Sequence, residues 1–211
     1  METFLADVSE MYNELFPYGV CPPSLFKELI RISYLRYEAS QALLNFEDVT
    51  EMSMRAQEIL ARVEAFDPQD SAQPGARFDE WLTIGHVYKH FIATYCIMSL
   101  SSLTLLPDIT LPTPMRRTMS SHATQLLHHI KIAKQSIPFR RHLALPLMVA
   151  GVEAIYRNES VRCWIEEALT ELGQHAGASS PLKTRALLRR YWQRGEPGWE
   201  ECFNQPYALL M

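Results

Sequence analysis

Two histidines, His86 and His90, lie four residues apart in the segment His-Val-Tyr-Lys-His. On an α-helix this spacing places both imidazoles on one face, where they could share a metal ion as in the HExxH motif. The glutamate of that motif is missing, and no third ligand lies near the pair in the sequence. A structural or catalytic metal needs at least three protein ligands. We therefore predict packing and hydrogen bonding for the pair and no bound metal, and for His128 and His129 one buried and one exposed imidazole.

Two tyrosines belong to the same segment. Tyr88 and Tyr95 are seven residues apart, which again favours one helix face, and they flank His90. They are either core aromatics with satisfied hydroxyl groups or the wall of a pocket whose hydroxyl and imidazole groups orient a ligand or donate a proton. In the second interpretation His86, Tyr88, His90 and Tyr95 are the candidate ligand-binding residues, and His90 and Tyr95 the candidate catalytic residues.

One carboxylate lies inside a strongly apolar segment. Glu153 follows the run Leu-Ala-Leu-Pro-Leu-Met-Val-Ala-Gly-Val, and a carboxylate there is costly unless it is paired. Arg157, one helical turn further on, is the expected partner, with Arg162 as the second choice. The spacing of Glu153 and Arg157 predicts a buried ion pair with a structural role. Gly151, in the same run, is expected to permit close helix packing, because glycine in a helix costs about 1 kcal/mol relative to alanine.

Most other chemistry is excluded by what the sequence lacks. Its four cysteines are far apart, so none has the spacing of a zinc site. It has no glycine-rich phosphate loop, no serine nucleophile elbow and no paired-carboxylate motif, and no cofactor is predicted. A net charge of −4 argues against direct nucleic-acid binding by this chain.

The elements that must position these residues are helices. Apolar residues recur with helical spacing along nearly the whole chain, and no segment alternates with period two. A helix over 77–105, apolar on several faces, is expected to be the central buried helix. The third expected helix starts at Asp48 or Thr50 and runs through Val63. The other expected helices cover 3–16, 24–44 with Ser24 as N-cap, 114–135, 138–157, 159–173 and 181–194.

At 211 residues with 47% hydrophobic and 21% charged residues, the chain has the size and composition of one globular domain over 1–211. We predict an all-α fold of about eight helices, interrupted by a mobile loop near 67–76, where two prolines and a glycine occur. The acidic N-terminal segment does not have the pattern of a targeting peptide, and the apolar stretches are too short for a membrane span. The expected location is therefore the cytoplasm or the nucleus.

Four segments, taken in order, carry a resemblance to a known family. They are GVCPPSLFKELIRISYL at 19–35, YKHFIATY at 88–95, LPLMVAGVEAIYRNESVRCWI at 145–165 and LLRRYWQRGEPGW at 187–199. The third, with an apolar run into Gly-x-Glu-Ala, an arginine-rich turn and a tryptophan, is the most specific. Together they resemble the C-terminal part of the fungal-specific transcription factor regulatory domain of zinc-cluster regulators. Phe91 departs from the small residue usual in the family.

The resemblance implies an all-α regulatory domain that forms a homodimer and in some members binds an apolar effector. The six-cysteine zinc cluster is absent, and so is the upstream half of the family's domain, so the chain is expected to be either a fragment or a natural short relative. Two functions remain open. One is a regulatory domain that binds a hydrophobic small molecule between helices. The other is a cofactor-independent cyclase or hetero-Diels–Alder-type pericyclase that works by orientation and hydrogen bonding. In both, the pocket is expected against the helix at 77–105.

Overall fold

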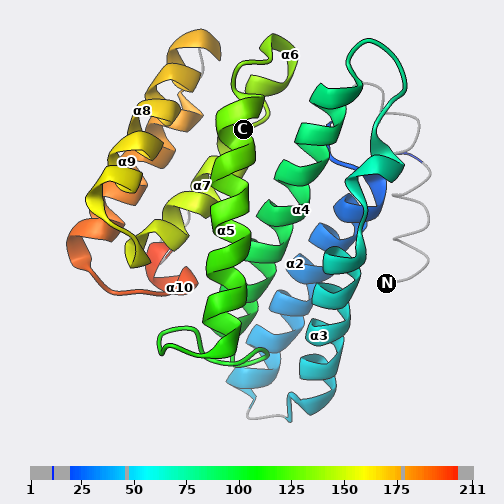
Figure 1. Ribbon diagram of the computed structural model, residues 1–211. Coiled ribbons are helices and arrows are strands. Elements are labelled where there is room, and N and C mark those ends of the chain that lie inside the picture. Colours follow the sequence, from blue (N-terminus) through cyan, green and yellow to red (C-terminus); the bar gives the residue numbers. More distant parts are fainter. Residues whose placement is uncertain (1–10, 12–19, 46–47, 177–178, 204–211) are drawn as a thin grey trace.

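The computed structural model describes residues 11, 20–45, 48–176 and 179–203, and within these ranges the regular structure is entirely helical (Figure 1). The all-α prediction is confirmed. The expected helix over 3–16 falls almost wholly outside the described residues. The elements are α2 (Pro23–Leu44), α3 (Thr50–Ala65), η1 (Pro68–Ser71), α4 (Phe78–Ser101), α5 (Pro114–Ala133), α6 (Ile137–Arg140), α7 (Ala144–Glu153), η2 (Ala154–Tyr156), α8 (Glu159–Ala176), α9 (Ser180–Arg194) and α10 (Trp199–Cys202), where η marks a 3-10 helix.

Helix α4 lies in the middle of the bundle, as its apolar composition predicts. It packs against α5 and α7 on one side and against α2, α3 and η1 on the other. Figure 1 shows α2 and α3 at one side of α4 and α5, with α8 and α9 at the opposite side. Because neighbours surround α4, buried residues occur all round its circumference, including Ile84, Val87, Phe91 and Ile97.

The short helix α7 connects the two sides of the molecule. It packs against α4 and α5 as well as against α8 and α9. The contact with α9 is very close, since a Cβ atom added to Gly151 would lie 2.3 Å from Leu188 Cδ1. The Trp192 indole Nε1 donates a hydrogen bond of 2.9 Å to the Gly151 carbonyl oxygen. Glycine at 151 therefore allows the two helices to approach, as the sequence predicts.

The expected helix over 77–105 ends earlier, at Ser101. Thr104 has φ +60°, in the left-handed region, and the backbone N–H of Leu105 bonds to the Leu100 carbonyl while that of Thr104 bonds to Ser101. This pair of bonds forms a Schellman motif, the usual way in which a helix satisfies its last carbonyl groups. The left-handed position is normally glycine, so a threonine there gave no sequence signal for the helix end.

The expected helix over 138–157 is wrong, because the structure divides it into α6, α7 and η2. A continuous helix would bring the ring of Pro146 against the carbonyl of His142 and would lack one hydrogen bond. A new start at Ala144 puts Pro146 in the first turn of α7, where its missing N–H costs nothing. The chain then tightens into η2 directly after Glu153.

Two further local predictions differ from the structure. Ser24 is not an N-cap: α2 starts at Pro23, and Pro22 occupies the cap position. The expected loop near 67–76 contains the 3-10 helix η1, whose first N–H groups are capped by Asp67. Pro68 of η1 packs on α4, since a Cβ atom at Gly85 would lie 3.1 Å from Pro68 Cβ.

No helix in the described ranges has the length and hydropathy needed to cross a membrane.

Candidate functional site

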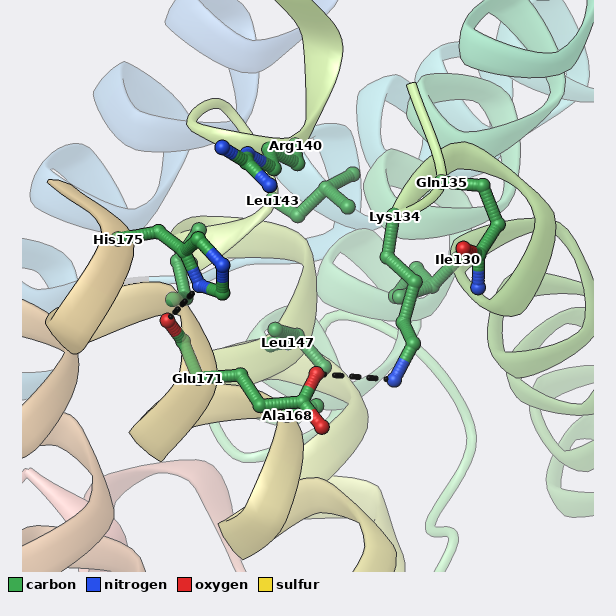
Figure 2. Close-up of a pocket in the computed structure, with 10 residues that line it drawn as sticks. Ile130, Lys134, Gln135, Arg140, Leu143, Leu147, Ala168, Glu171 and His175 are labelled. Carbon is green, nitrogen blue, oxygen red and sulfur yellow. Dashed lines mark hydrogen bonds and ion pairs between the residues drawn. The ribbon is translucent and has the colours of Figure 1, made fainter. Parts of the chain in front are cut away.

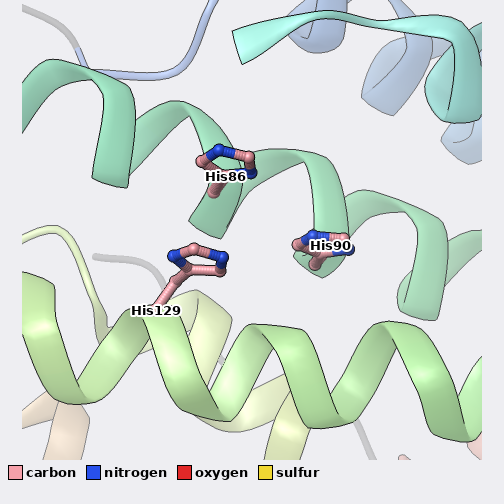
Figure 3. Close-up of side chains that lie close together, drawn as sticks. All are labelled: His86, His90 and His129. Carbon is pink, nitrogen blue, oxygen red and sulfur yellow. The ribbon is translucent and has the colours of Figure 1, made fainter.

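The first candidate site is a cluster of imidazoles between α4 and α5. His86 and His90 share one face of α4, as predicted, and this face is directed at α5, which contributes His129 (Figure 3). The ring centroids of His86 and His129 are 4.5 Å apart with planes 5° from parallel. Those of His90 and His129 are 5.9 Å apart. The sequence did not place His129 beside the pair, because 39 residues separate it from His90.

A fourth histidine links the cluster to a carboxylate. Nδ1 of His90 lies 3.0 Å from Nδ1 of His122, and Nε2 of His122 lies 3.3 Å from Oε1 of Glu64 on α3. Nδ1 of His86 and Nδ1 of His129 are both buried and have no hydrogen-bond partner among the described residues. Of the neighbouring pair expected to differ in exposure, His128 is exposed and His129 is half-buried.

Burial keeps this cluster neutral. Desolvation, with a smaller contribution from the neighbouring imidazoles, lowers the pKa of His90 to about 3 and the pKa of His129 to about 4. The pKa values of His86 and His122 are also lowered, first by burial, although Glu64 opposes the effect at His122. At neutral pH each ring therefore carries one N–H and one lone pair. Three of these rings, His86, His90 and His129, each offer a nitrogen within 4.8 Å of the other two.

The two tyrosines of α4 contact other parts of the molecule. Tyr88 is buried with its ring edge-on to Phe91. The ring of Tyr95 packs edge-on against Trp199 of α10, with centroids 4.9 Å apart, and burial raises the pKa of its hydroxyl group. His90 and Tyr95 therefore have different neighbours, and the structure does not bring together the two residues that the sequence suggested as catalytic. Five residues turn an α-helix by well over a quarter circle, which explains the separation.

Glu153 and Arg157 lie together at the end of α7. Glu153 is 1% exposed, and Arg157 Nε donates a hydrogen bond to its Oε2. Arg157 also donates to the Ser120 carbonyl at 2.9 Å and to Thr124 Oγ1 at 3.0 Å, both on α5. Burial raises the pKa of Glu153, and Arg157 opposes this effect only in part. The arrangement joins α7 to α5.

A second candidate site is a pocket of about 220 Å³ bounded by α5, α6, α7 and α8 (Figure 2). None of the four α4 residues suggested by the sequence lines it. Its apolar wall consists of Ile130, Leu143, Leu147, Ala168 and Leu172. This pocket could not be predicted from local sequence patterns, because its residues come from four separate helices.

The polar rim of the pocket is mainly cationic. Lys134 Nζ forms an ion pair of 3.0 Å with Glu171 Oε2, and His175 Nδ1 lies 2.7 Å from the Glu171 carbonyl oxygen (Figure 2). The guanidinium group of Arg140 makes no hydrogen bond or ion pair with the described residues. An arginine free of protein partners beside an apolar wall is suited to an amphipathic anion.

Comparisons with known proteins identify the family. The family described as "Fungal specific transcription factor domain" matches residues 7–210. The chain is also 34% identical over 198 residues to the "Phomenoic acid biosynthesis cluster-specific transcriptional regulator" of Leptosphaeria maculans. That alignment covers 92% of this chain but only 37% of the relative, so the chain spans little more than a third of the regulator's length. No solved structure matches.

These comparisons bear on the two functions that the sequence left open. The matched relative is a transcriptional regulator, and nothing in the comparisons supports a cyclase or pericyclase. The family match covers nearly the whole chain, and the all-helical structure agrees with the resemblance found in the four sequence segments. The chain belongs to the fungal-specific transcription factor domain family.

Proposed function

We propose that this chain is the effector-binding part of a transcriptional regulator and that the pocket of Figure 2 binds a hydrophobic small molecule with a carboxylate group. The observation that carries the proposal is the guanidinium group of Arg140, which pairs with none of the described residues and lies beside an apolar wall. A buried apolar wall with a few polar groups at its edge is typical of small-molecule sites.

The apolar wall limits the size of the ligand. Leu143 and Leu147 are almost fully buried, so they form a fixed floor for the pocket. The volume of 220 Å³ is below the roughly 300–1,000 Å³ of pockets that enclose drug-sized ligands. A short alkyl chain fits inside, and a longer molecule would extend past the rim towards solvent.

The charges of the rim select the headgroup. Lys134 is already paired with Glu171, whereas Arg140 is available for a bidentate contact with a carboxylate. The regulator that this chain resembles is named for a biosynthetic cluster whose product is an acid. A regulator that senses an acidic product or intermediate of its own cluster would need such a headgroup site.

The position of the pocket suits a regulatory role. Leu147 belongs to α7, the helix that also packs against α4, α5 and α9. A ligand that contacts Leu147 would favour one placement of α7 over another, and a ligand shifts a conformational equilibrium only through such differential contacts. We also infer that the chain acts on transcription as a homodimer and without touching DNA itself.

Isothermal titration calorimetry with octanoate and 1-octanol tests the proposal. Arg140→Gln should lower the affinity for octanoate by at least about tenfold, since it removes a charge-assisted hydrogen bond, and should leave 1-octanol binding unchanged. Ala168→Leu fills the pocket and should weaken the binding of both ligands.

Tyr95→Phe distinguishes this location from the one beside α4, because it removes only a hydroxyl group far from Arg140. Full octanoate affinity in Tyr95→Phe is the expected result. Loss of affinity in Tyr95→Phe with none in Arg140→Gln would place the pocket beside α4 and contradict the proposal.

A further inference from the structure

We propose that His86, His90 and His129 form a binding site for a transition-metal dication, Zn²⁺ foremost, which would join α4 to α5 (Figure 3). The site shares no residue with the pocket of Figure 2, so an experiment that contradicts one proposal leaves the other untouched.

The three rings lie within reach of one ion. One nitrogen of each ring lies within 4.8 Å of a nitrogen of the other two. Around a tetrahedral ion with bonds of about 2.0–2.1 Å, ligand nitrogens lie ~3.4 Å apart. Figure 3 shows His86 and His90 directed from α4 towards α5, and His129 directed back towards them. Closing the remaining gap requires the rings to turn about their side-chain bonds, and all three are half-buried rather than locked in the core.

The hydrogen bonds around His90 fix which of its nitrogens carries the proton. An ionised Glu64 only accepts, so His122 donates to it from Nε2. A neutral His122 then has a lone pair on Nδ1, and His90 donates to that lone pair from its own Nδ1. This leaves the lone pair of His90 on Nε2. Ligating histidines usually donate their second ring N–H to an outer carboxylate, carbonyl group or water. Here His122 takes that place and is itself held by Glu64.

The other two ligands have polar atoms that nothing in the described structure satisfies. Nδ1 of His86 and Nδ1 of His129 are buried without a hydrogen-bond partner among the described residues. A buried polar atom left unpaired is destabilising. Coordination to a metal removes that cost, either by binding the lone pair itself or by turning the ring.

One ammonium group lies near the ligand rings. Lys89 acts on His86 and His90, and Asp67 opposes it at His86. The amine of Lys89 is held by the Phe66 carbonyl at 2.8 Å, and the Glu64 carboxylate contacts His122. The three imidazoles themselves must therefore supply the affinity for a cation. Three imidazoles leave the fourth position of a tetrahedral ion to water, since no cysteine or carboxylate of the described residues belongs to the group.

Titration of the chelator-treated protein with Co²⁺ and Zn²⁺ tests this site. Co²⁺ bound to three imidazoles should give visible d–d absorption typical of tetrahedral coordination, and Zn²⁺ should displace it. His129→Asn should weaken Co²⁺ binding by more than about 100-fold, beyond the 10–100-fold typical of losing an outer partner. His86→Asn should have the same effect and replaces His129→Asn if that variant does not fold by circular dichroism.

The control is His128→Asn, which alters the exposed neighbour of His129 and should leave the spectrum and affinity unchanged. Glu64→Gln tests the positioning role of the carboxylate: affinity should fall by about tenfold with the band positions unchanged. The proposal is overturned if the unaltered protein gives no tetrahedral Co²⁺ spectrum, or if His128→Asn weakens binding as much as His129→Asn does.

Discussion

Glu153 is the residue whose environment most clearly opposes its charge. It is 1% exposed, and burial raises its pKa although Arg157 donates a hydrogen bond to it. The ion pair therefore offsets only part of the cost of burying the carboxylate. Removing one partner of such a pair is still destabilising, because the other charge is left without compensation.

Glu153→Ala should lower the free energy of unfolding by about 3 kcal/mol, at the lower end of the range for buried pairs, because Arg157 keeps its bonds to Ser120 and Thr124. Glu153→Gln should cost clearly less, since the amide oxygen still accepts from Arg157 and carries no charge. Urea unfolding at pH 7 measures both changes. Equal stability of Glu153→Ala and the unaltered protein would exclude a structural role for the pair.

The same residue predicts the direction of a pH effect. A carboxyl group with a raised pKa in the folded protein binds its proton more tightly there than in the unfolded chain. Its contribution to stability is fully present below the ordinary pKa of 4.5 and is lost as the pH rises through the folded value. The stability of the unaltered protein relative to Glu153→Gln should therefore increase on acidification from pH 7 towards pH 4.5.

At the scale of elements, helix positions follow from apolar periodicity, and the boundaries follow from single residues. The central position of α4 was predictable from its apolar residues on several faces. Its end was not, because Thr104 takes a backbone conformation that normally belongs to glycine. The break before α7 was present in the sequence as Pro146, but the apolar run around it suggested continuity.

Thr104→Gly should raise the free energy of unfolding by about 1 kcal/mol. A β-branched residue in the left-handed region is strained, and glycine adopts that conformation without a steric cost. Thr104→Ala is the matched control, since alanine keeps most of the strain and should give little of the gain. Thermal unfolding of both variants decides the matter, and a stabilised Thr104→Ala would show that the effect does not come from backbone strain.

Gly151→Ala should destabilise the protein by about 1–3 kcal/mol, because the added methyl group would overlap Leu188. Leu188 is fully buried, so its side chain has no free space into which to move. A double-mutant cycle with Leu188→Ala measures the effect. The loss caused by Gly151→Ala should be smaller in the Leu188→Ala background, and strict additivity would indicate that the two residues do not clash.

At the scale of the whole molecule, the family and the fold class were predictable from the sequence, whereas the full residue sets of the two proposed sites were not. The spacing of His86 and His90 predicted a shared face, but His129 reaches them only through the register of α5 on α4. The lining of the Figure 2 pocket depends on how four helices meet, a long-range property that local periodicity does not contain. Arg140 is informative only because no described residue pairs with its guanidinium group.

The purified chain should not bind duplex DNA in a sequence-specific manner. Its net charge is −4, and its four cysteines lack the spacing of a zinc cluster. A gel-shift experiment at physiological salt, with promoter DNA and a scrambled duplex of the same length, should give no shifted band for either. A band that appears only with promoter DNA and survives added salt would contradict this prediction.

Neighbouring residues of α5 belong to the two proposed sites: His129 to the imidazole cluster and Ile130 to the pocket of Figure 2. Consecutive residues of a helix point in different directions, so the single helix α5 contributes one residue to each site. If an acid in the pocket changed the affinity for a metal ion, thermodynamic reciprocity would require the ion to change the affinity for the acid by the same factor. Such a domain would act as a coincidence detector: it would respond to the acid and to the metal ion together, and α5 would be the element that couples the two sites.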